Sequence, residues 1–253
     1  MTSPLAPFRL ILVSPLYAGN VGACARVAAN FDVQDIAIIS PRCQWKSPQA
    51  LTYAKGPARN YLDLFKQWDH LAQALDGCSH AIAFTRRQGH LRQPSVRLDE
   101  LSTLVLRTQQ KIALVFGPED FGLNAEDAAL CNHICTFSTA AVMPSMNLSH
   151  AVAVVLSRLY EDRSRCSANT EEIEPTAIVS EHEELFAHWR NTMIHAGMTT
   201  GGNPDRMMAH FRRALQRASL TARDIGLFRA FLSKVQVAMG TRHRTRSTSD
   251  QSP

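Results

Sequence analysis

Two acidic residues follow a glycine loop near the middle of the chain, and polar residues precede an apolar stretch soon afterwards. Glu119 and Asp120 come shortly after Gly117, which ends an apolar run, and residues 144–147 lead into the second apolar stretch. Glycine lets a backbone approach a ligand closely, and open α/β sheets bind ligands where strands end and helices begin. Residues 111–160 are therefore expected to line a ligand-binding crevice.

A second polar turn, with a basic residue behind it, lies near the amino terminus. Asn20 follows a glycine, and Arg26 stands six positions further on, in a helix predicted to end near Phe31. Apolar residues such as Val21 and Cys24 repeat there at helical spacing, and Arg26 lies off that stripe. By itself, Arg26 fits an ordinary solvated helix residue.

Three sequence motifs occur in order along the chain. The first is Asn20-Val-Gly-Ala-Cys-Ala-Arg26, the second is FGPEDFGL from Phe116, and the third is PSMNLSHAV from Pro144. Together they resemble motifs 1, 2 and 3 of the SPOUT (SpoU/TrmH-type) RNA 2′-O-methyltransferases, and the resemblance covers residues 8–239. The carboxy-terminal helices are similar to those of the TrmJ branch of this family, which methylates the anticodon loop of tRNA.

The resemblance implies an α/β domain with a parallel sheet and a trefoil knot, followed by a small C-terminal helical domain. It also implies that S-adenosyl-L-methionine binds in the knot, largely through main-chain groups. Relatives of the TrmJ type usually read TSAR where this chain reads Thr85-Arg86-Arg87. Side-chain contacts of this loop with the cofactor are therefore expected to differ from those of the relatives. The expected cofactor-binding residues are Thr85, Arg86, Arg87, Phe116, Gly117, Phe137, Pro144, Ser145, Met146 and Leu148.

Arg26 is the central catalytic residue that the resemblance implies, with Asn20, Glu119, Ser145 and Asn147 around it. Methylation of a ribose 2′-OH requires loss of the hydroxyl proton, alignment of the oxygen with the methyl group and a grip on the nearby phosphate. Because a guanidinium stays protonated in proteins, we expect Arg26 to act as an electrostatic clamp and not as a base. Glu119 is expected to bond Asn20 or Arg26, and Asn147 to cap a helix while shaping the cofactor loop.

The sequence around these residues predicts alternating strands and helices. This alternation favours an α/β fold with a parallel sheet. Continuous apolar runs are typical of strands that are buried on both faces of such a sheet. Residues 62–68 fit a strand or a helix equally well. Strands are predicted at 8–14, 35–40, 80–85, 112–116 and 134–137, and helices up to about 31, at 48–54, 69–75, 98–106 and 148–160, and from 124.

Composition narrows the class of protein. The 253 residues are 45% hydrophobic and 19% charged, which suits a proper core in either one large domain or one domain with a small appendage. No apolar run is long enough for a membrane span and no signal peptide is seen, so a cytoplasmic protein is expected. No GxGxxG follows the first strand and no GxxxxGK[ST] occurs, which argues against a dinucleotide oxidoreductase and a P-loop NTPase.

The cysteines show no pattern of a metal site or a redox motif. Six cysteines occur without a CxxC pair. Cys131, His133 and Cys135 form the one cluster to consider, but structural zinc takes four ligands and no second cluster supplies the rest. We therefore expect no metal, and interpret the cysteines as small buried residues of a reduced protein.

The last part of the chain carries the basic excess. From Ser180 onward there are eleven Lys or Arg and six Asp or Glu, and this surplus equals the net charge of +5 of the whole chain. Residues 180–183 are interpreted as a capping box, and Asn203 and Pro204 as a helix start. A last helix is predicted from Thr221 to about Met239.

One helix of this region has two chemically different sides. Basic residues repeat along one side, and Met207, Phe211, Ala214 and Leu215 cover the opposite side. The basic side fits either the solvated surface of a helical hairpin or a stripe that faces RNA phosphates. The residues of this stripe, which are expected to bind RNA, are Arg206, His210, Arg213 and Arg217.

The leading hypothesis on function combines these features with the resemblance. The chain is expected to be an S-adenosylmethionine-dependent tRNA 2′-O-methyltransferase that acts on cytidine or uridine at nucleotide 32 of the anticodon loop. A homodimer is expected, with Arg26 of one subunit facing the cofactor of the other, and the apolar helix 148–159 fits either its interface or the core. A ribosomal RNA 2′-O-methyltransferase and a non-catalytic RNA-binding protein on the same scaffold remain alternatives. The expected divisions are a methyltransferase domain (1–162), a linker (163–179), a helical RNA-binding domain (180–240) and a disordered tail (241–253).

Overall fold

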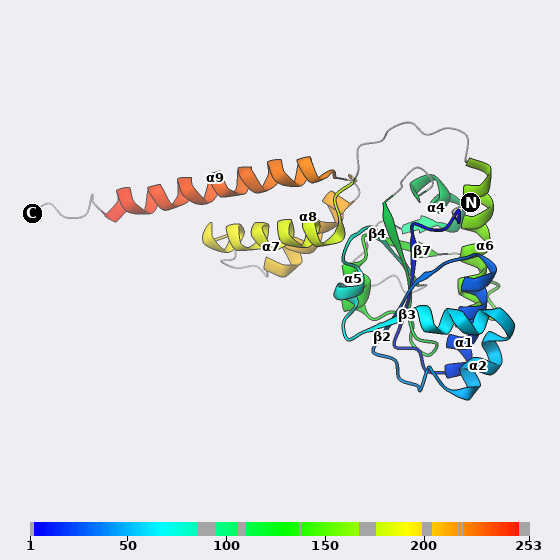
Figure 1. The fold of residues 1–253 in the computed structure, drawn as a ribbon. Helices are drawn as coiled ribbons and strands as arrows, with labels where there is room; N and C mark the ends of the chain where they lie inside the picture. The colour runs from blue at the N-terminus through cyan, green and yellow to red at the C-terminus, as the bar shows by residue number, and fades with distance from the viewer. Residues whose placement is uncertain are drawn as a thin grey trace, which may run out of the picture. The chain divides into compact units, whose positions relative to one another are not determined.

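The chain divides into two compact units, Met1–Ile173 and Glu174–Pro253. The structure, a computed structural model, describes residues 3–85, 95–105, 110–136, 138–166, 176–198, 204–216, 218 and 220–247. The first unit contains a sheet and its covering helices, and the second is built of helices (Figure 1). Four residues that the sequence assigns to binding sites lie outside the described residues, namely Arg86, Arg87, Phe137 and Arg217.

Seven strands form one sheet within the described residues, and every pairing is parallel. Their order across the sheet is β3-β2-β1-β6-β4-β7-β5. The predicted α/β fold with a parallel sheet is confirmed. The strands are β1 (Phe8–Val13), β2 (Asp35–Ile39), β3 (Phe65–Trp68), β4 (Cys78–Phe84), β5 (Ser95–Arg97), β6 (Lys111–Phe116) and β7 (His133–Thr136).

The apolar runs of the sequence mark five of these strands closely, because strands of a parallel sheet are buried on both faces. The ambiguous segment divides into a 3-10 helix, η1 (Gly56–Leu64), and the edge strand β3. Strand β5 was not predicted. Its three residues, with exposed ends, form no apolar run, and they are extended because they pair with β7.

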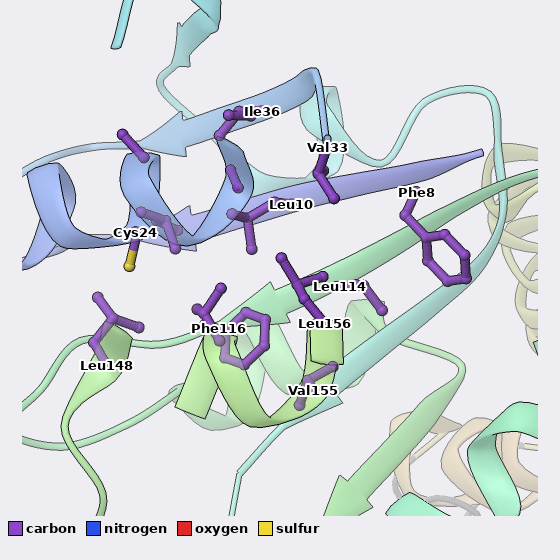
Figure 2. Packing of buried hydrophobic residues seen from close by; sticks show 14 of the residues in the cluster. Phe8, Leu10, Cys24, Val33, Ile36, Leu114, Phe116, Leu148, Val155 and Leu156 are labelled. Atoms are coloured by element: carbon purple, nitrogen blue, oxygen red, sulfur yellow. The ribbon is translucent and has the colours of Figure 1, made fainter. Parts of the chain in front are cut away.

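Helices α1 (Ala18–Asn30) and α6 (Leu148–Cys166) cover one face of the sheet and pack against each other (Figure 1). Figure 2 shows Val155 and Leu156 of α6 in the same buried cluster as Phe116 of β6. The apolar residues of α6 therefore belong to the core, which is one of the two roles predicted for them. The other helices of this unit are α2 (Pro48–Ala54), α3 (Leu71–Ala74), α4 (Leu98–Val105) and α5 (Ala125–Leu130).

The second unit contains α7 (Val179–His195), α8 (Pro204–Gln216) and α9 (Ala222–Ser247). Trp189 of α7 packs against both buried clusters of this unit, so a single aromatic ring joins its three helices. The buried members of these clusters are Ala177, Leu185, Leu220, Ile225 and Leu232 in one, and Phe186, Met193 and Met208 in the other.

Two helix ends differ from the sequence-based expectation. The predicted cap at Ser180 is wrong, because α7 already begins at Val179 and Glu181 Oε2 accepts a hydrogen bond from Ile178 N at 2.9 Å. The last helix, α9, continues to Ser247, so helix replaces the first part of the expected disordered tail.

The buried side of α8 also differs from the expectation. Met208 is buried while Met207 is exposed, because α8 packs with Met208, Phe211 and Leu215 inward at helical spacing. Among the described helices, none is sufficiently long and apolar to span a membrane.

Candidate active site

The loops predicted to bind the cofactor follow neighbouring strands. Strand β4 lies between β6 and β7, and Phe84 pairs in register with both Phe116 and Cys135. Since all three strands are parallel, the loops that follow them begin at the same edge of the sheet. Thr85 and Gly117 are thereby brought to one place, although they are distant in the sequence.

The strand order reverses between β1 and β6. Strands β2 and β3 lie on one side of β1, and β6, β4, β7 and β5 lie on the other. Open α/β sheets bind ligands outside the carboxyl ends of their strands at such a switch point. The loop after β1 leads to Asn20 on α1 and the loop after β6 carries Glu119, so both residues lie at this edge.

A hydrogen-bond network joins the three sequence motifs. Asn20 donates from Nδ2 to Oε1 of Glu119 at 2.7 Å, so of the two partners predicted for Glu119, Asn20 and Arg26, the structure shows Asn20. The other carboxylate oxygen of Glu119 accepts from the backbone N–H of Leu16 at 2.9 Å. Asn147 donates from Nδ2 to Oδ1 of Asn20 at 3.0 Å. The side-chain amide of Asn20 is therefore oriented from both of its ends.

Asn147 also caps the helix that follows it, as predicted. Its Oδ1 accepts from the backbone N–H of Ser149 at 2.9 Å and from the Ser149 hydroxyl at 2.8 Å. Such bonds satisfy N–H groups that have no partner within the first turn of a helix. Because α6 is anchored in the core, the network is attached to a rigid element.

Two glycines determine the path of the loop that carries Glu119. A Cβ on Gly117 would lie 2.3 Å from the backbone N of Leu123, so the loop folds back on itself without room for a side chain. Gly122 has a φ of +68°, in the left-handed region that favours glycine. The position of Glu119 therefore depends on glycine at both sites.

The loop before α6 exposes apolar side chains next to the network. Val142, Met143 and Met146 are 91%, 67% and 38% exposed. The loop is internally braced, since Thr139 Oγ1 donates to the carbonyl of Pro144 at 2.9 Å. Exposed apolar groups beside a polar site are suited to cover a flat apolar ligand or to meet a second protein surface.

The structure does not bring every predicted residue into the network. Ser145 is exposed, and the side chains of Phe116 and Leu148 are buried in the core, so only their main chain can face a ligand. Arg26 is exposed and pairs with no acid in the described part of the chain. Arg26 is six positions from Asn20 along α1. This corresponds to a rise of about 9 Å and puts the two residues on different sides of the helix.

The sequence of the first unit matches a known family. The model of the SpoU rRNA Methylase family matches residues 7–157, which is more than half of the chain. The chain belongs to the SpoU methylase family. A second model, the C-terminal domain of the tRNA methyltransferase TrmJ, matches residues 180–250 of the other unit.

Relatives and solved structures extend this result over most of the chain. The tRNA (cytidine/uridine-2'-O-)-methyltransferase TrmJ of Yersinia pestis is 26% identical over 235 residues, which covers 90% of this chain and 91% of that protein. The tRNA (cytidine-2'-O-)-methyltransferase TrmJ of Methanocaldococcus jannaschii is 33% identical over 159 residues, which covers 62% and 68%. The crystal structure of TrmJ from Z. mobilis ZM4 superposes with a TM-score of 0.76 at 26% identity, covering 90% and 98%. The predicted resemblance to the SPOUT family and its TrmJ branch is confirmed.

An ion pair that the sequence did not indicate supports the active-site loop of this SpoU family member. Arg42 donates from Nη2 to both carboxylate oxygens of Asp120, at 3.0 and 3.2 Å, and from Nε to the carbonyl of Ser14 at 3.3 Å. Desolvation raises the pKa of Asp120, but the N–H of Phe121 and the Arg42 guanidinium together hold it below its ordinary value. The loop after β2 is thereby tied to the residue next to Glu119.

The cysteine and histidine cluster is part of the core. The described residues contain no group of three or more His, Cys, Asp and Glu side chains that could hold a metal ion. The His133 ring stacks on His80 with centroids 5.6 Å apart, and burial together with His80 lowers the pKa of His133 to about 4. Burial, then the charge of Asp127, raises the pKa of the Cys131 thiol. The side chains of Cys131 and His133 are therefore uncharged near neutral pH.

Several arginines of the second unit are already paired with acids. The Arg212 guanidinium also lies 4.4 Å from the ring centroid of Phe186, which combines an ion pair with a cation–π contact. Paired arginines contribute less to a phosphate-binding surface than a count of charges suggests. The pairs are Arg190 with Asp205 at 2.8 Å, Arg229 with Glu184 at 2.7 Å, and Arg212 with Glu183.

The predicted basic stripe on α8 is outside these pairs. Arg206 and His210 are exposed, and Arg213 is half-buried. In the described part of the chain, these three side chains pair with no acid. The guanidinium groups of Arg206 and Arg213 therefore remain available to a polyanion.

Proposed function

We propose that the protein is an S-adenosyl-L-methionine-dependent tRNA (cytidine/uridine-2′-O-)-methyltransferase that modifies nucleotide 32 of the anticodon loop. The network of Asn20, Glu119 and Asn147 carries the proposal, because it assembles three motifs of the family at one edge of the sheet. The names of the relatives and the TrmJ C-terminal domain match support tRNA as the substrate. The proposal includes a cytoplasmic homodimer with a knotted methyltransferase domain over residues 1–162.

The loops at the carboxyl ends of β4 and β6, together with the loop before α6, fit an adenosyl cofactor. The expected cofactor-binding residues that the structure describes in these loops have hydroxyl or apolar side chains, or are glycine, and none of them is charged. Such walls with backbone amides suit a purine. Thr85, Gly117 and residues 144–148 would hold the cofactor, largely through the main chain. When bound, S-adenosyl-L-methionine supplies an activated methyl group.

Arg26 acts on the ribose and its phosphate in this proposal. Its guanidinium remains protonated and carries five N–H donors. It holds the phosphate beside the target nucleotide and stabilises the negative charge that develops on the 2′ oxygen as the hydroxyl proton leaves. Asn20, oriented by Glu119 and Asn147, keeps the turn before α1 in place beside the ribose.

The position of Arg26 supports an active site that two copies share. In one chain, Arg26 lies on a different side of α1 from Asn20, and a second copy would bring an equivalent Arg26 to the network. The exposed side chains of Val142 and Met143 offer apolar surface that the second copy would cover. A monomer is therefore expected to be inactive.

Mass mapping of RNA tests the substrate. Transfer RNA and ribosomal RNA from a strain that lacks the gene are incubated with the purified protein and S-adenosyl-L-methionine, and the methylated nucleotides are located. We expect a methyl group on the ribose at nucleotide 32 of tRNA. Ribosomal RNA is the second candidate, because the matched family model is named for it. Binding of RNA without calorimetric binding of the cofactor identifies a non-catalytic RNA-binding protein instead.

Substitution of Arg26 tests its role. Arg26→Ala should abolish methyl transfer, whereas Arg26→Lys should retain part of it, because the charge remains although the fork of donors is lost. Arg59→Ala, at another exposed arginine of the first unit, is the matched control and should be nearly fully active. Complete loss in Arg26→Lys, with RNA and cofactor binding intact, contradicts a purely electrostatic role.

Mixed dimers test the shared site. As homodimers, Arg26→Ala should be inactive and Glu119→Ala should be about a hundredfold slower than the wild type. In a mixed dimer, one site receives Arg26 from one subunit and Glu119 from the other, so equal mixing should restore about a quarter of the wild-type activity. Subunit exchange in the mixtures is verified by mass spectrometry. If activity is then not restored, Arg26 and Glu119 act in the site of the same subunit.

A further inference from the structure

An open hollow lies between the loop after β2 and the edge strand β3. Its volume is about 490 Å³, which is within the range of pockets that bind small ligands. Gln44, Trp45, Lys46 and Gln67 line it. None of these residues belongs to the Asn20, Glu119 and Asn147 network or to the expected cofactor loops, so the hollow has no role in the proposed methyl transfer itself.

Trp45 organises the polar groups of this hollow. Its indole packs against Phe65 of β3 with ring centroids 5.6 Å apart, and its Nε1 donates to Oε1 of Gln67 at 3.0 Å. Because indole is only a donor, this bond fixes which end of the Gln67 amide faces it. The NH2 end of Gln67 remains as an oriented donor, and no acceptor for it is found among the described residues.

Lys46 brings positive charge to the same place. Its ammonium lies 4.9 Å from the centroid of the Trp45 ring, where a cation is attracted by the ring face. The residue is exposed and pairs with no acid in the part of the chain that is described. Gln44, also exposed, adds a second amide, and no acidic side chain lines the hollow.

We propose that this hollow binds one nucleotide of the RNA substrate, outside the nucleotide that is methylated. Lys46 would contact a phosphate, the Gln67 amide can donate to the edge of an unpaired base, and the Gln44 amide can both donate to it and accept from it. Amides serve this purpose because the Watson–Crick edge of every base combines donors and acceptors. The inference rests on the proposed function, and it gives the methyltransferase unit an RNA contact of its own.

The location of the hollow agrees with this role. Arg42 belongs to the same loop, and at most about 11 Å of extended chain separates it from Trp45. Arg42 binds Asp120, which is adjacent to Glu119 of the network. The hollow therefore lies within reach of nucleotides near a target ribose that is bound at the network.

The affinity of the full-length protein for a tRNA transcript, measured over a range of salt concentrations, tests the inference. Lys46→Ala should weaken binding about three- to tenfold and reduce the slope of log affinity against log salt by about one, as expected for a lost phosphate contact. Gln44→Ala should weaken binding without changing that slope. Lys66→Ala is the matched control, because Lys66 precedes Gln67 on the same edge strand and alternation directs it to the opposite face.

A second measurement locates the RNA directly. Transfer RNA that contains 4-thiouridine is crosslinked to the wild type, and a crosslink to the peptide with residues 44–46 supports the inference. Crosslinks confined to other segments overturn it, as do equal affinities and equal salt slopes for Lys46→Ala and Lys66→Ala. A change in dimerisation without a change in RNA affinity also overturns it, and assigns the hollow to contacts between copies.

These outcomes are distinguishable from failure of the proposed function. A wild type that binds tRNA and transfers no methyl group contradicts the proposed function, while the affinities of the variants still report on the hollow. In an active enzyme, Lys46→Ala should raise the KM for tRNA and leave both kcat and the KM for S-adenosyl-L-methionine unchanged. A selective fall in kcat contradicts a role in RNA binding alone.

Discussion

The two units of this protein use their polar side chains in different ways. In the first unit, Asn20 bonds to Glu119 and to Asn147, which are 99 and 127 positions away in the chain. In the second unit, charged side chains such as Arg229 form ion pairs across helix surfaces, and others, such as Arg206, face solvent. The first unit holds the polar groups of the network in a single arrangement, whereas the second unit has charged side chains exposed on its helices.

In the proposed function, this difference corresponds to two kinds of task. Chemistry on one hydroxyl group needs donors and acceptors that are already in place, because reorientation during the reaction adds to its barrier. Recognition of an RNA backbone needs positive charge over a broad surface and tolerates mobile side chains. Substitutions in the first unit should therefore affect the rate of methyl transfer strongly, and single substitutions in the second should affect RNA affinity modestly.

The largest effect is expected when the network loses its central acid. Glu119→Ala removes the partner of Asn20 Nδ2 and of Leu16 N, and the resulting shift of the turn before α1 should lower kcat about a hundredfold. Single-turnover methylation of tRNA measures the change. Glu126→Ala, at an exposed acid of α5, is the matched control and should retain normal activity. Equal rates for the two variants would show that the network does not position reacting groups.

A stability comparison between two helical glycines should give the next largest effect. A Cβ on Gly22 would lie 2.0 Å from the carbonyl oxygen of Ala50, so Gly22→Ala should destabilise the first unit by about 1–3 kcal/mol. Gly226 of α9 has no atom within 4 Å of such a Cβ, and Gly226→Ala should stabilise the second unit by about 0.5–1 kcal/mol.

Hydrogen exchange followed by mass spectrometry resolves the two units and measures both changes. Protection should fall in α1 and α2 for Gly22→Ala and rise in α9 for Gly226→Ala. If Gly22→Ala is as stable as the wild type, α1 and α2 do not pack as closely as the structure shows.

The ion pair between Arg42 and Asp120 should have an intermediate effect. Arg42→Ala and Asp120→Ala should each lower kcat/KM about three- to tenfold, because the loop that carries Glu119 loses one of its attachments while the network bonds remain. The double variant should be no slower than the slower single variant, since both changes remove the same contact. Additive losses would indicate that the two residues act separately.

The smallest effect is expected for one arginine of the basic stripe. Arg206→Ala should weaken tRNA binding about threefold and reduce the salt slope by about one, with kcat unchanged at saturating tRNA. Arg229→Ala is the matched control, because Arg229 already forms an ion pair with Glu184. The affinity of this variant for tRNA should stay near that of the wild type. Larger losses for Arg229→Ala than for Arg206→Ala would show that the paired face binds the RNA.

Features that depend on neighbouring residues could be predicted from the sequence. The buried strands are apolar runs, Asn147 caps the helix that begins at the next residue, and Pro204 begins α8. Predictions failed where local signals are weak. β5 is extended only because it pairs with β7, and the start of α7 follows from a bond between Glu181 and Ile178. On α8, packing against the other helices selected Met208 over its neighbour Met207 as the buried residue.

The contacts of the candidate site also include some that could be predicted from the sequence and some that could not. A bond of Glu119 to Asn20 or Arg26 was predicted, because the resemblance placed all three residues in one site, and the structure shows the bond to Asn20. The pair of Arg42 and Asp120 was not, since no motif contains Arg42 and 78 positions separate the two residues. The hollow at Trp45 also escaped prediction, because it forms only where the loop after β2 packs beside β3.

The sequence by itself determined the buried strands, the three motifs and the basic excess of the last helices, since these depend on the types and spacing of nearby residues. Tertiary structure alone decided which polar groups meet. The parallel sheet inserts β6 between β1 and β4, and this places Glu119 beside Asn20 and holds Asp120 against Arg42. It also leaves Arg26 away from the network in a single chain. Hydrogen bonds and ion pairs act over a few ångströms in space, so distance along the chain cannot reveal them until the fold has brought their partners together.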